Sequence, residues 1–267
     1  MTVASALPGG RGPVVADEPP ARLAGTRLWR SRYLSPEDRR ALEGAVAWSR
    51  AYGANTDLVR AREQVDHLLF ITRGWGYQYL CTRDGGRQLP ALLVPGDMMN
   101  LDALLFGELD YGVKTLTPAT IVAVPCSQAL VLAETHPGIA RALTSLALIE
   151  NAALSKTALS IGRRPACARL AHLFCELMVR LGYEDDGAYS FEFPLTQEQI
   201  GDALGLTPVH VNRMMQQLRG ENLIRVSHRI MTIRDVAALR QACEFDPAYL
   251  HMDQQVPRTY QDAHLGA

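Results

Sequence analysis

The chain has 267 residues, with 27 basic and 28 acidic side chains and a formal net charge of −1 at pH 7. This length provides enough sequence for two hydrophobic cores, and the near-neutral charge excludes a uniformly basic nucleic-acid coat, although not a sequence-specific DNA-binding protein with local basic patches. No run of about 18 apolar residues occurs, which excludes a membrane-spanning helix.

The five cysteines are scattered and contain no C-x-x-C pair: Cys81, Cys126, Cys167, Cys175 and Cys243. An odd, dispersed set predicts reduced thiols and therefore a cytoplasmic protein. Cys167 and Cys175 share a helical segment and are interpreted as packing residues. The seven histidines show no metal-ligand spacing, and His172 is expected at the core because apolar residues surround it. No metal site is predicted.

Residues 1–30 are predicted to be a disordered tail. They include Gly9, Gly10, Pro13, Pro19 and Pro20 and lack a continuous apolar stretch, so they resemble neither a folded element nor a signal peptide.

Residues 31–133 are predicted to form a small β-barrel or jelly roll. Ser35 followed by Pro36 and two acidic residues indicates the start of a short helix. Asp84-Gly85 predicts a hairpin, and the Pro95–Asp97 segment predicts a sharp turn. Five strands are expected at roughly ten-residue spacing, which is typical of a barrel. They are Leu68–Thr72, Tyr77–Cys81, Gln88–Leu93, Val113–Leu116 and Thr120–Val124.

Residues 134–163 contain the longest helical pattern, expected over Pro137–Ile161 and ended by Gly162. Apolar residues recur every three or four positions and form one seam, which a helix outside a barrel packs on another surface. That surface is the same helix of a second copy, or the chain's own barrel, or both. The seam residues are Ile139, Leu143, Leu146, Ile149 and Ala153, and their assignment to dimerisation is what the family resemblance given below implies.

Residues 164–245 are predicted to form a C-terminal domain, entered through a hinge at Arg163–Pro165. A helix with an apolar stripe from Leu170 to Leu181 comes first, and a strand follows in which Tyr189, Phe191 and Phe193 alternate. Asp235 caps a last helix that runs through Ala242. Residues 246–267 are polar and are predicted to be a C-terminal tail, partly ordered at best.

The segment Leu195–Ile224 predicts two short helices joined by a tight turn. Thr196 is the N-cap of the first helix, and Gln199 completes a capping box. Gly205 ends that helix because glycine adopts positive φ readily. Thr207 caps the second helix, with Pro208 in the first helical position, where a missing N–H costs nothing.

The second of these helices carries two different faces. Val211, Met214, Met215 and Leu218 fall on the inward side, whereas the outward stripe is Val209, Asn212, Arg213 and Gln216. No carboxylate lies between Thr207 and Gly220, and the stripe offers groups that contact a thymine methyl, an adenine edge and a guanine edge in a major groove. The alternative is an ordinary amphipathic helix with incidental outer residues.

Two apolar runs after this helix, Leu223–Val226 and Ile230–Ile233, predict a hairpin and complete a winged helix. Arg225, His228, Arg229 and Arg234 lie on or beside it and are suited to phosphate contacts. For each of these residues taken singly, a place in a solvated turn without DNA contact is an equally good interpretation.

The TQEQIGDALGLT segment and the VNR run that ends at Arg213 resemble the DNA-binding domain of the Crp/Fnr superfamily, and the PVHVNR version resembles a rhizobial-type sub-group. The resemblance covers about residues 31–245. It implies an α+β protein with a cyclic-nucleotide-binding-like barrel, a long dimerisation helix and a C-terminal winged helix-turn-helix. It also implies a homodimer on a palindromic site in double-stranded DNA, and contact with RNA polymerase if the protein activates transcription. The family's Arg–Glu pair is replaced here by Pro208 and Val209, so the DNA sequence read should differ.

The resemblance also implies a ligand site, and this chain departs from it. Relatives that bind cyclic nucleotides carry a Gly-Glu and an Arg-Ser pair after the PGD turn; here Asn100-Leu101 and Tyr111-Gly112 stand at those positions. A buried phosphate without its arginine would be an unpaired charge, so cyclic AMP is not expected to bind. A shifted alignment using Glu108 and Lys114 is the alternative. The Fnr-type iron–sulfur site is not expected either, because the first cysteine is Cys81. No cofactor is predicted.

These observations predict a regulator of transcription whose sensor barrel lacks cyclic-AMP chemistry. Two alternatives remain: a regulator gated by an unidentified small molecule in the barrel, and a sensor module without DNA binding. An enzyme is not expected, because no G-x-S-x-G, H-E-x-x-H or phosphate-cradling glycine loop occurs. The residues expected at DNA are Thr196, Thr207, Pro208, Val209, His210, Asn212, Arg213, Gln216 and Arg229.

Overall fold

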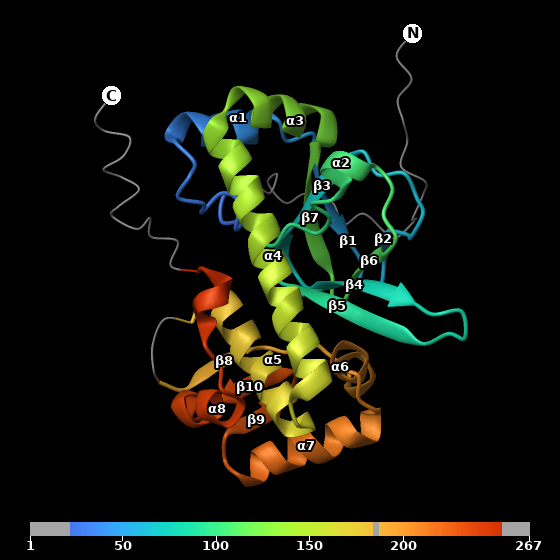
Figure 1. The fold of residues 1–267 in the computed structure, drawn as a ribbon, viewed down its shortest axis with the longest axis vertical. Coiled ribbons are helices and arrows are strands. Elements are labelled where there is room, and N and C mark those ends of the chain that lie inside the picture. Colours follow the sequence, from blue (N-terminus) through green and yellow to red (C-terminus); the bar gives the residue numbers. More distant parts are fainter. Residues whose placement is uncertain (1–21, 184–186, 253–267) are drawn as a thin grey trace.

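The computed structural model describes residues 22–183 and 187–252. Figure 1 shows a β-rich N-terminal part and a smaller, mainly helical C-terminal part, with the long helix α4 (Pro137–Arg163) running alongside both. The predicted α+β architecture is confirmed. None of the described helices is both long and apolar enough to cross a membrane.

Two antiparallel sheets form the barrel. One has the strand order β1-β7-β3, and the other has the order β2-β6-β4-β5. The five predicted strands are confirmed, with Phe70, Ile121 and Val113 buried between the sheets. β1 and β2 were not predicted, because their residues are mostly half-buried and do not alternate. The bounds are β1 (Trp48–Tyr52), β2 (Asp57–Val59), β3 (His67–Arg73), β4 (Gly76–Cys81), β5 (Arg87–Leu93), β6 (Gly112–Thr115) and β7 (Ala119–Pro125).

Three short helices cap the barrel: α1 (Pro36–Gly44), α2 (Ala103–Phe106) and α3 (Cys126–Thr135). Ser35 caps α1 as predicted, in a capping box with Asp38. The predicted N-terminal tail is wrong for residues 22–30, where turns bury Leu23 and Leu28 in the barrel core. These two leucines lie five residues apart, a spacing that signals neither helix nor strand. Residues 1–21 of that predicted tail lie outside the described residues.

The apolar seam of α4 packs inside its own chain. Ile139, Leu143, Leu146 and Ile149 are all buried, and Ala153 is partly buried against the core of the C-terminal part. The assignment of these five residues to dimerisation is therefore corrected in favour of the other surface considered, the chain's own barrel and neighbouring elements. The helix also continues past Gly162 to Arg163, so glycine does not end it.

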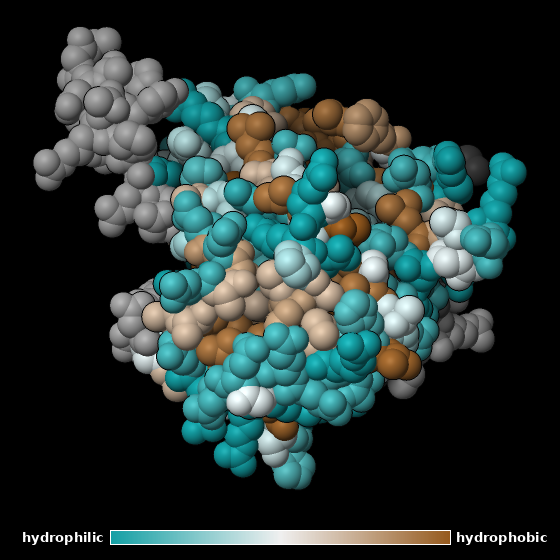
Figure 2. Space-filling view, turned by 60° about the horizontal axis from the view of Figure 1, so that its bottom comes forward, coloured by the Kyte–Doolittle hydropathy of each residue, from teal (hydrophilic) through white to brown (hydrophobic). Residues whose placement is uncertain are grey.

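The opposite face of α4 is uncovered. One row of exposed residues on this face recurs at spacings of three and four: Thr144, Leu148, Asn151, Ser155, Leu159 and Gly162. Leu148 is 64% exposed and Leu159 is 45% exposed. These six residues are called the open face of α4 below. Figure 2 shows hydrophobic residues gathered in the middle of this side of the molecule, with hydrophilic residues below them.

The C-terminal part is built on α5 (Ala166–Arg180), whose stripe fills the core with Leu170, Phe174 and Leu177. A three-stranded antiparallel sheet of order β8-β10-β9 closes one side. The remaining elements are β8 (Tyr189–Glu192), α6 (Gln197–Leu204), α7 (Pro208–Gly220), β9 (Ile224–Ser227), β10 (Ile230–Ile233), α8 (Val236–Cys243) and a 3-10 helix, Pro247–Leu250.

Residues 246–252 of the predicted C-terminal tail are ordered and packed on the C-terminal part. Tyr249 and Leu250 are buried, and the Tyr249 hydroxyl donates to Glu176 at 2.7 Å. His172 lies in the same cluster, 4% exposed, with its ring stacked on Tyr249, as expected for a core histidine. Burial lowers its pKa to about 4. Residues 253–267 of the predicted tail lie outside the described residues.

Candidate nucleic-acid interface

The first helix of the predicted pair, α6, forms as its sequence indicates. The Thr196 hydroxyl accepts from the Gln199 N–H at 3.2 Å, and the Gln199 side chain accepts from the Thr196 N–H at 2.9 Å. Gly205 ends the helix at φ 64°. A side chain at Gly201 would collide with the carbonyl of Leu206, so glycine is required where the turn folds back on the helix.

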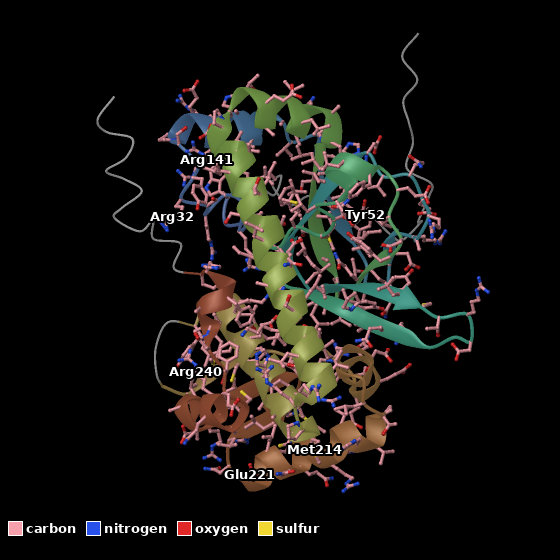
Figure 3. The ribbon with its side chains drawn as sticks, in the orientation of Figure 1. Arg32, Tyr52, Arg141, Met214, Glu221 and Arg240 are labelled. Atoms are coloured by element: carbon pink, nitrogen blue, oxygen red, sulfur yellow. The ribbon has the colours of Figure 1, made fainter. Side chains whose placement is uncertain are left out.

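The second helix, α7, begins at a Thr207 cap that accepts from the His210 N–H at 3.3 Å, with Pro208 in the first position. Val211, Met215 and Leu218 are buried against α5, as predicted from the helical period. Met214 is only half-buried, at the border of the packed face. Met214 and Glu221, labelled in Figure 3, mark the course of α7 along the lower edge of the molecule.

The outer face of α7 is exposed to solvent, and its polar side chains have no hydrogen-bond partners among the described residues. Val209 is 73% exposed, Arg213 and Gln216 are exposed, and Asn212 is half-exposed. Within residues 22–183 and 187–252, none of the three polar side chains makes a hydrogen bond or ion pair. The first carboxylate after α7 is Glu221, which accepts from Gln217 at 2.9 Å. This face therefore presents free donors and acceptors without acidic groups.

The predicted hairpin is the pair β9 and β10, joined by His228 and Arg229. Both residues have positive φ, 50° and 63°, as a two-residue turn with the twist of a hairpin requires. Arg229 is held by its backbone, because its carbonyl accepts from the Phe193 N–H at 2.7 Å. Arg225, Arg229 and Arg234 are all exposed, so their guanidinium groups are accessible to phosphates.

Residues 168–242, which include α6, α7 and the hairpin, match the family described as the Crp-like helix-turn-helix domain. The C-terminal part of the chain therefore carries a Crp-like helix-turn-helix domain. The match makes this part of the chain a DNA-binding domain of the kind found in transcription regulators.

Relatives agree over most of the chain. The transcriptional activator protein FnrL of Cereibacter sphaeroides is 24% identical over 199 residues, which is 73% of this chain and 79% of the relative. The fumarate and nitrate reduction regulatory protein of Escherichia coli is 23% identical over 184 residues, 69% of this chain and 74% of the relative. The structure of FixK2 from Bradyrhizobium japonicum matches with a TM-score of 0.67 at 22% identity, covering 73% of this chain and 96% of FixK2.

The positions at which the resemblance places a phosphate site form hydrogen bonds within the chain. Asn100 is fully buried and closes a loop: its side chain accepts from the Leu69 N–H at 2.8 Å and donates to the His67 carbonyl at 2.9 Å. The Tyr111 hydroxyl donates to Asp102 at 2.5 Å, and burial raises the pKa of Tyr111. At this position the side chain is therefore a neutral phenol that donates to a carboxylate.

The two residues of the shifted alignment form ion pairs within the chain. Glu108 lies 3.4 Å from Arg62, and Lys114 lies 3.6 Å from Asp57.

The five cysteines are distributed over both parts of the fold. Cys81 is exposed on β4, whereas Cys126 is buried at the start of α3. The thiols of Cys175 and Cys243 lie 4.0 Å apart in the C-terminal core. Among the described residues, no group of three or more His, Cys, Asp or Glu side chains could hold a metal ion.

Contacts between the barrel and the helix-turn-helix were not predicted. The Arg87 guanidinium at the start of β5 lies 2.6 Å from Asp202 on α6, and Gln88 donates to the Ala203 carbonyl at 3.1 Å. The two residues of each pair are separated by 115 residues of sequence, and local sequence patterns do not predict such a contact. They fix the placement of α6 on the barrel and therefore the placement of α7.

Proposed function

We propose that this regulator binds a palindromic DNA site as a homodimer and reads it with the outer face of α7. The observation that carries the proposal is that face: Val209, Arg213 and Gln216 are exposed together on a capped helix, without intramolecular partners among the described residues and without an acidic neighbour. A helix whose role was only structural would normally carry charged pairs there.

Each residue of the interface has a proposed role. Arg213 reads a guanine, because a guanidinium bonds O6 and N7 together. Asn212 and Gln216 read an adenine or a phosphate, and Val209 packs on a thymine methyl. The remaining residues, which lie at helix starts and on the hairpin, position the protein on the phosphate backbone: Thr196, Thr207, Pro208, His210 and Arg229. The PVHVNR segment supports placing the chain in a rhizobial-type sub-group.

We infer that the dimer forms through the open face of α4. Spacings of three and four from Thr144 to Gly162 are the pattern of a two-stranded coiled coil. Ser155 and Gly162 are small enough to allow close helix approach. A buried Asn151 pair would fix the register, as a single polar position does in coiled coils. Contact with RNA polymerase follows only if the protein activates transcription.

The sensor barrel is proposed to work without cyclic AMP or cyclic GMP. Two observations support this: Tyr111, at the position where the resemblance places an arginine, donates to Asp102, and no group of three or more metal-ligating side chains lies among the described residues. The protein then either responds to another small molecule or acts through its amount in the cytoplasm. A sensor module without DNA binding is not favoured, because the α7 face would have no role.

The proposal is tested by selecting genomic DNA fragments with the full chain and measuring affinity against salt concentration. We expect selected fragments to share an inverted repeat with half-sites about one helical turn apart, the spacing that helix-turn-helix dimers such as the cyclic-AMP receptor show. Affinity should fall steeply with salt for all sequences, with a constant preference for the repeat. Selection of fragments without any common sequence would contradict the proposal.

A further inference from the structure

A cavity of about 130 Å³ lies where the barrel, α4 and the C-terminal part meet. Its walls come from β5, α4, α5 and α6, with Arg27 and Leu250 from the two ends of the described chain. Much of the lining is apolar, including Leu89, Leu146 and Ile149. In Figure 1 this junction lies behind the middle of α4, next to β5 and α5. The cavity therefore touches both the sensor and the DNA-binding part.

One end of the cavity is charged, and its charges are nearly matched. Arg180 of α5 lies 2.6 Å from Asp97 of the PGD turn and 3.2 Å from Glu176. Arg27 approaches Asp97 to 3.5 Å, and Glu176 also accepts from Tyr249. Two guanidinium groups thus face two carboxylates. At the other end, the Arg169 guanidinium donates to the carbonyls of Arg164 and Leu204.

Glu150 of α4 is a carboxylate of the cavity wall that has no partner of its own in the described part of the chain. It lines the cavity, and among the described residues it forms no hydrogen bond or ion pair. Burial, with Asp97 nearby, raises its pKa to about 7, although Arg27 and Arg180 act in the opposite direction. An ionised carboxylate in this position would be stabilised by one additional positive charge.

We propose that this cavity binds a small organic amine, with its ammonium group paired to Glu150 and its apolar part against Leu146, Ile149 and Leu89. The carboxylate of Glu150, unpartnered among the described residues, carries the assignment, because Arg27 and Arg180 already pair with Asp97 and Glu176, and Arg169, the third cation of the lining, donates to two backbone carbonyls. A neutral ligand would leave Glu150 without a partner. The site goes beyond DNA reading and does not depend on it.

The size of the cavity limits the ligand. An apolar protein cavity of about 150 Å³ holds benzene. A volume of about 130 Å³ with a charged end therefore suits a compact amine and excludes a nucleotide. Benzylamine is a suitable probe, and benzyl alcohol is its neutral counterpart of nearly equal shape.

The experiment measures calorimetric binding of both probes to the full chain without DNA, at pH 8, where Glu150 is mainly ionised. We expect saturable benzylamine binding and at least tenfold weaker binding of benzyl alcohol. Glu150→Gln should weaken benzylamine binding at least tenfold and leave benzyl alcohol unchanged, whereas Glu134→Gln, an exposed control on α3, should change neither. Ala153→Leu, which fills the cavity without changing charge, should weaken both.

Three results would overturn the proposal: equal binding of the two probes, unchanged benzylamine binding by Glu150→Gln, or no saturable binding of benzylamine at millimolar concentration. A thermal melt of each variant identifies misfolding, and Ala153→Leu tests the location independently of Glu150. Because DNA is absent, failure here leaves the DNA-binding proposal unchanged. If the protein bound benzylamine but selected no common DNA sequence, the DNA-binding proposal would fail and the amine site would stand.

Discussion

Leu146 and Leu148, two positions apart on α4, should respond differently when each is replaced by aspartate. Leu146 is 4% exposed and packs in the barrel core, whereas Leu148 is 64% exposed on the open face. Leu146→Asp removes core packing and buries a carboxylate, so it should destabilise the single chain. Leu148→Asp should leave the single chain folded and weaken the dimer.

The magnitudes follow from burial. Truncating a core leucine costs about 2–5 kcal/mol before the cost of the carboxylate is added, so Leu146→Asp should remove most of the stability of a typical domain. Burying a full leucine side chain is worth about 1.5–3 kcal/mol. Because about two thirds of Leu148 remains exposed and a symmetric dimer uses it twice, losing it should cost roughly 2–4 kcal/mol of dimer free energy. That is roughly a 30- to 1,000-fold weaker dimer.

Sedimentation equilibrium over a range of concentrations measures the dimer constant, and urea denaturation at low concentration measures the stability of the chain. Leu148→Asp should sediment as a folded monomer with weakened binding to a palindromic site. If Leu148→Asp remained a dimer of unchanged affinity, the open face would not be the dimer contact, and the argument from spacing and exposure would be refuted.

Three further predictions concern titration and ligand binding. Calorimetry should detect no binding of cyclic AMP or cyclic GMP at physiological concentrations, because Tyr111 occupies the phosphate position; micromolar affinity for either nucleotide would contradict this. Burial lowers the pKa of His172 from 6.5 to about 4, so the unfolded chain takes up the proton first and about 3 kcal/mol of stability is lost as the pH falls from 6.5 to 4. His172→Phe should abolish that loss in denaturation curves, and an unchanged pH profile would argue against it. Burial raises the pKa of Glu150 from 4.5 to about 7, so its ionisation should cost up to about 3 kcal/mol as the pH rises through that interval. Glu150→Gln should therefore be more stable than the native chain at pH 8 and equal to it at pH 4.5; equal stability at both would show that Glu150 is already paired.

The helix-turn-helix could be predicted closely from sequence because its signals are local. The caps at Thr196 and Thr207, the glycine at Gly205 and the period of Val211, Met215 and Leu218 each act within one or two turns of chain, and the structure confirms them. The strands of the barrel with clear apolar runs were predictable for the same reason.

The sequence could not show which surface the apolar seam of α4 packs on. The seam of Leu143 and Leu146 predicts an apolar contact, but periodicity does not say whether the contact is a second copy or the same chain. The open face was overlooked because its exposed residues mix leucine with asparagine, serine and glycine. Contacts such as Arg180 with Asp97, separated by 83 residues, arise from topology and have no local signature.

Arg213 on α7 is proposed to read a base, and the direct test compares affinity for a selected DNA site with affinity for a scrambled one. Arg213→Ala should cost about 1–3 kcal/mol on the selected site and relax the preference at one base per half-site, with little change on scrambled DNA. Arg219→Ala, which removes an exposed arginine from the same helix but off the outer face, should preserve the ratio of the two affinities. An equal loss on selected and scrambled DNA for Arg213→Ala would make Arg213 a phosphate contact and contradict the account.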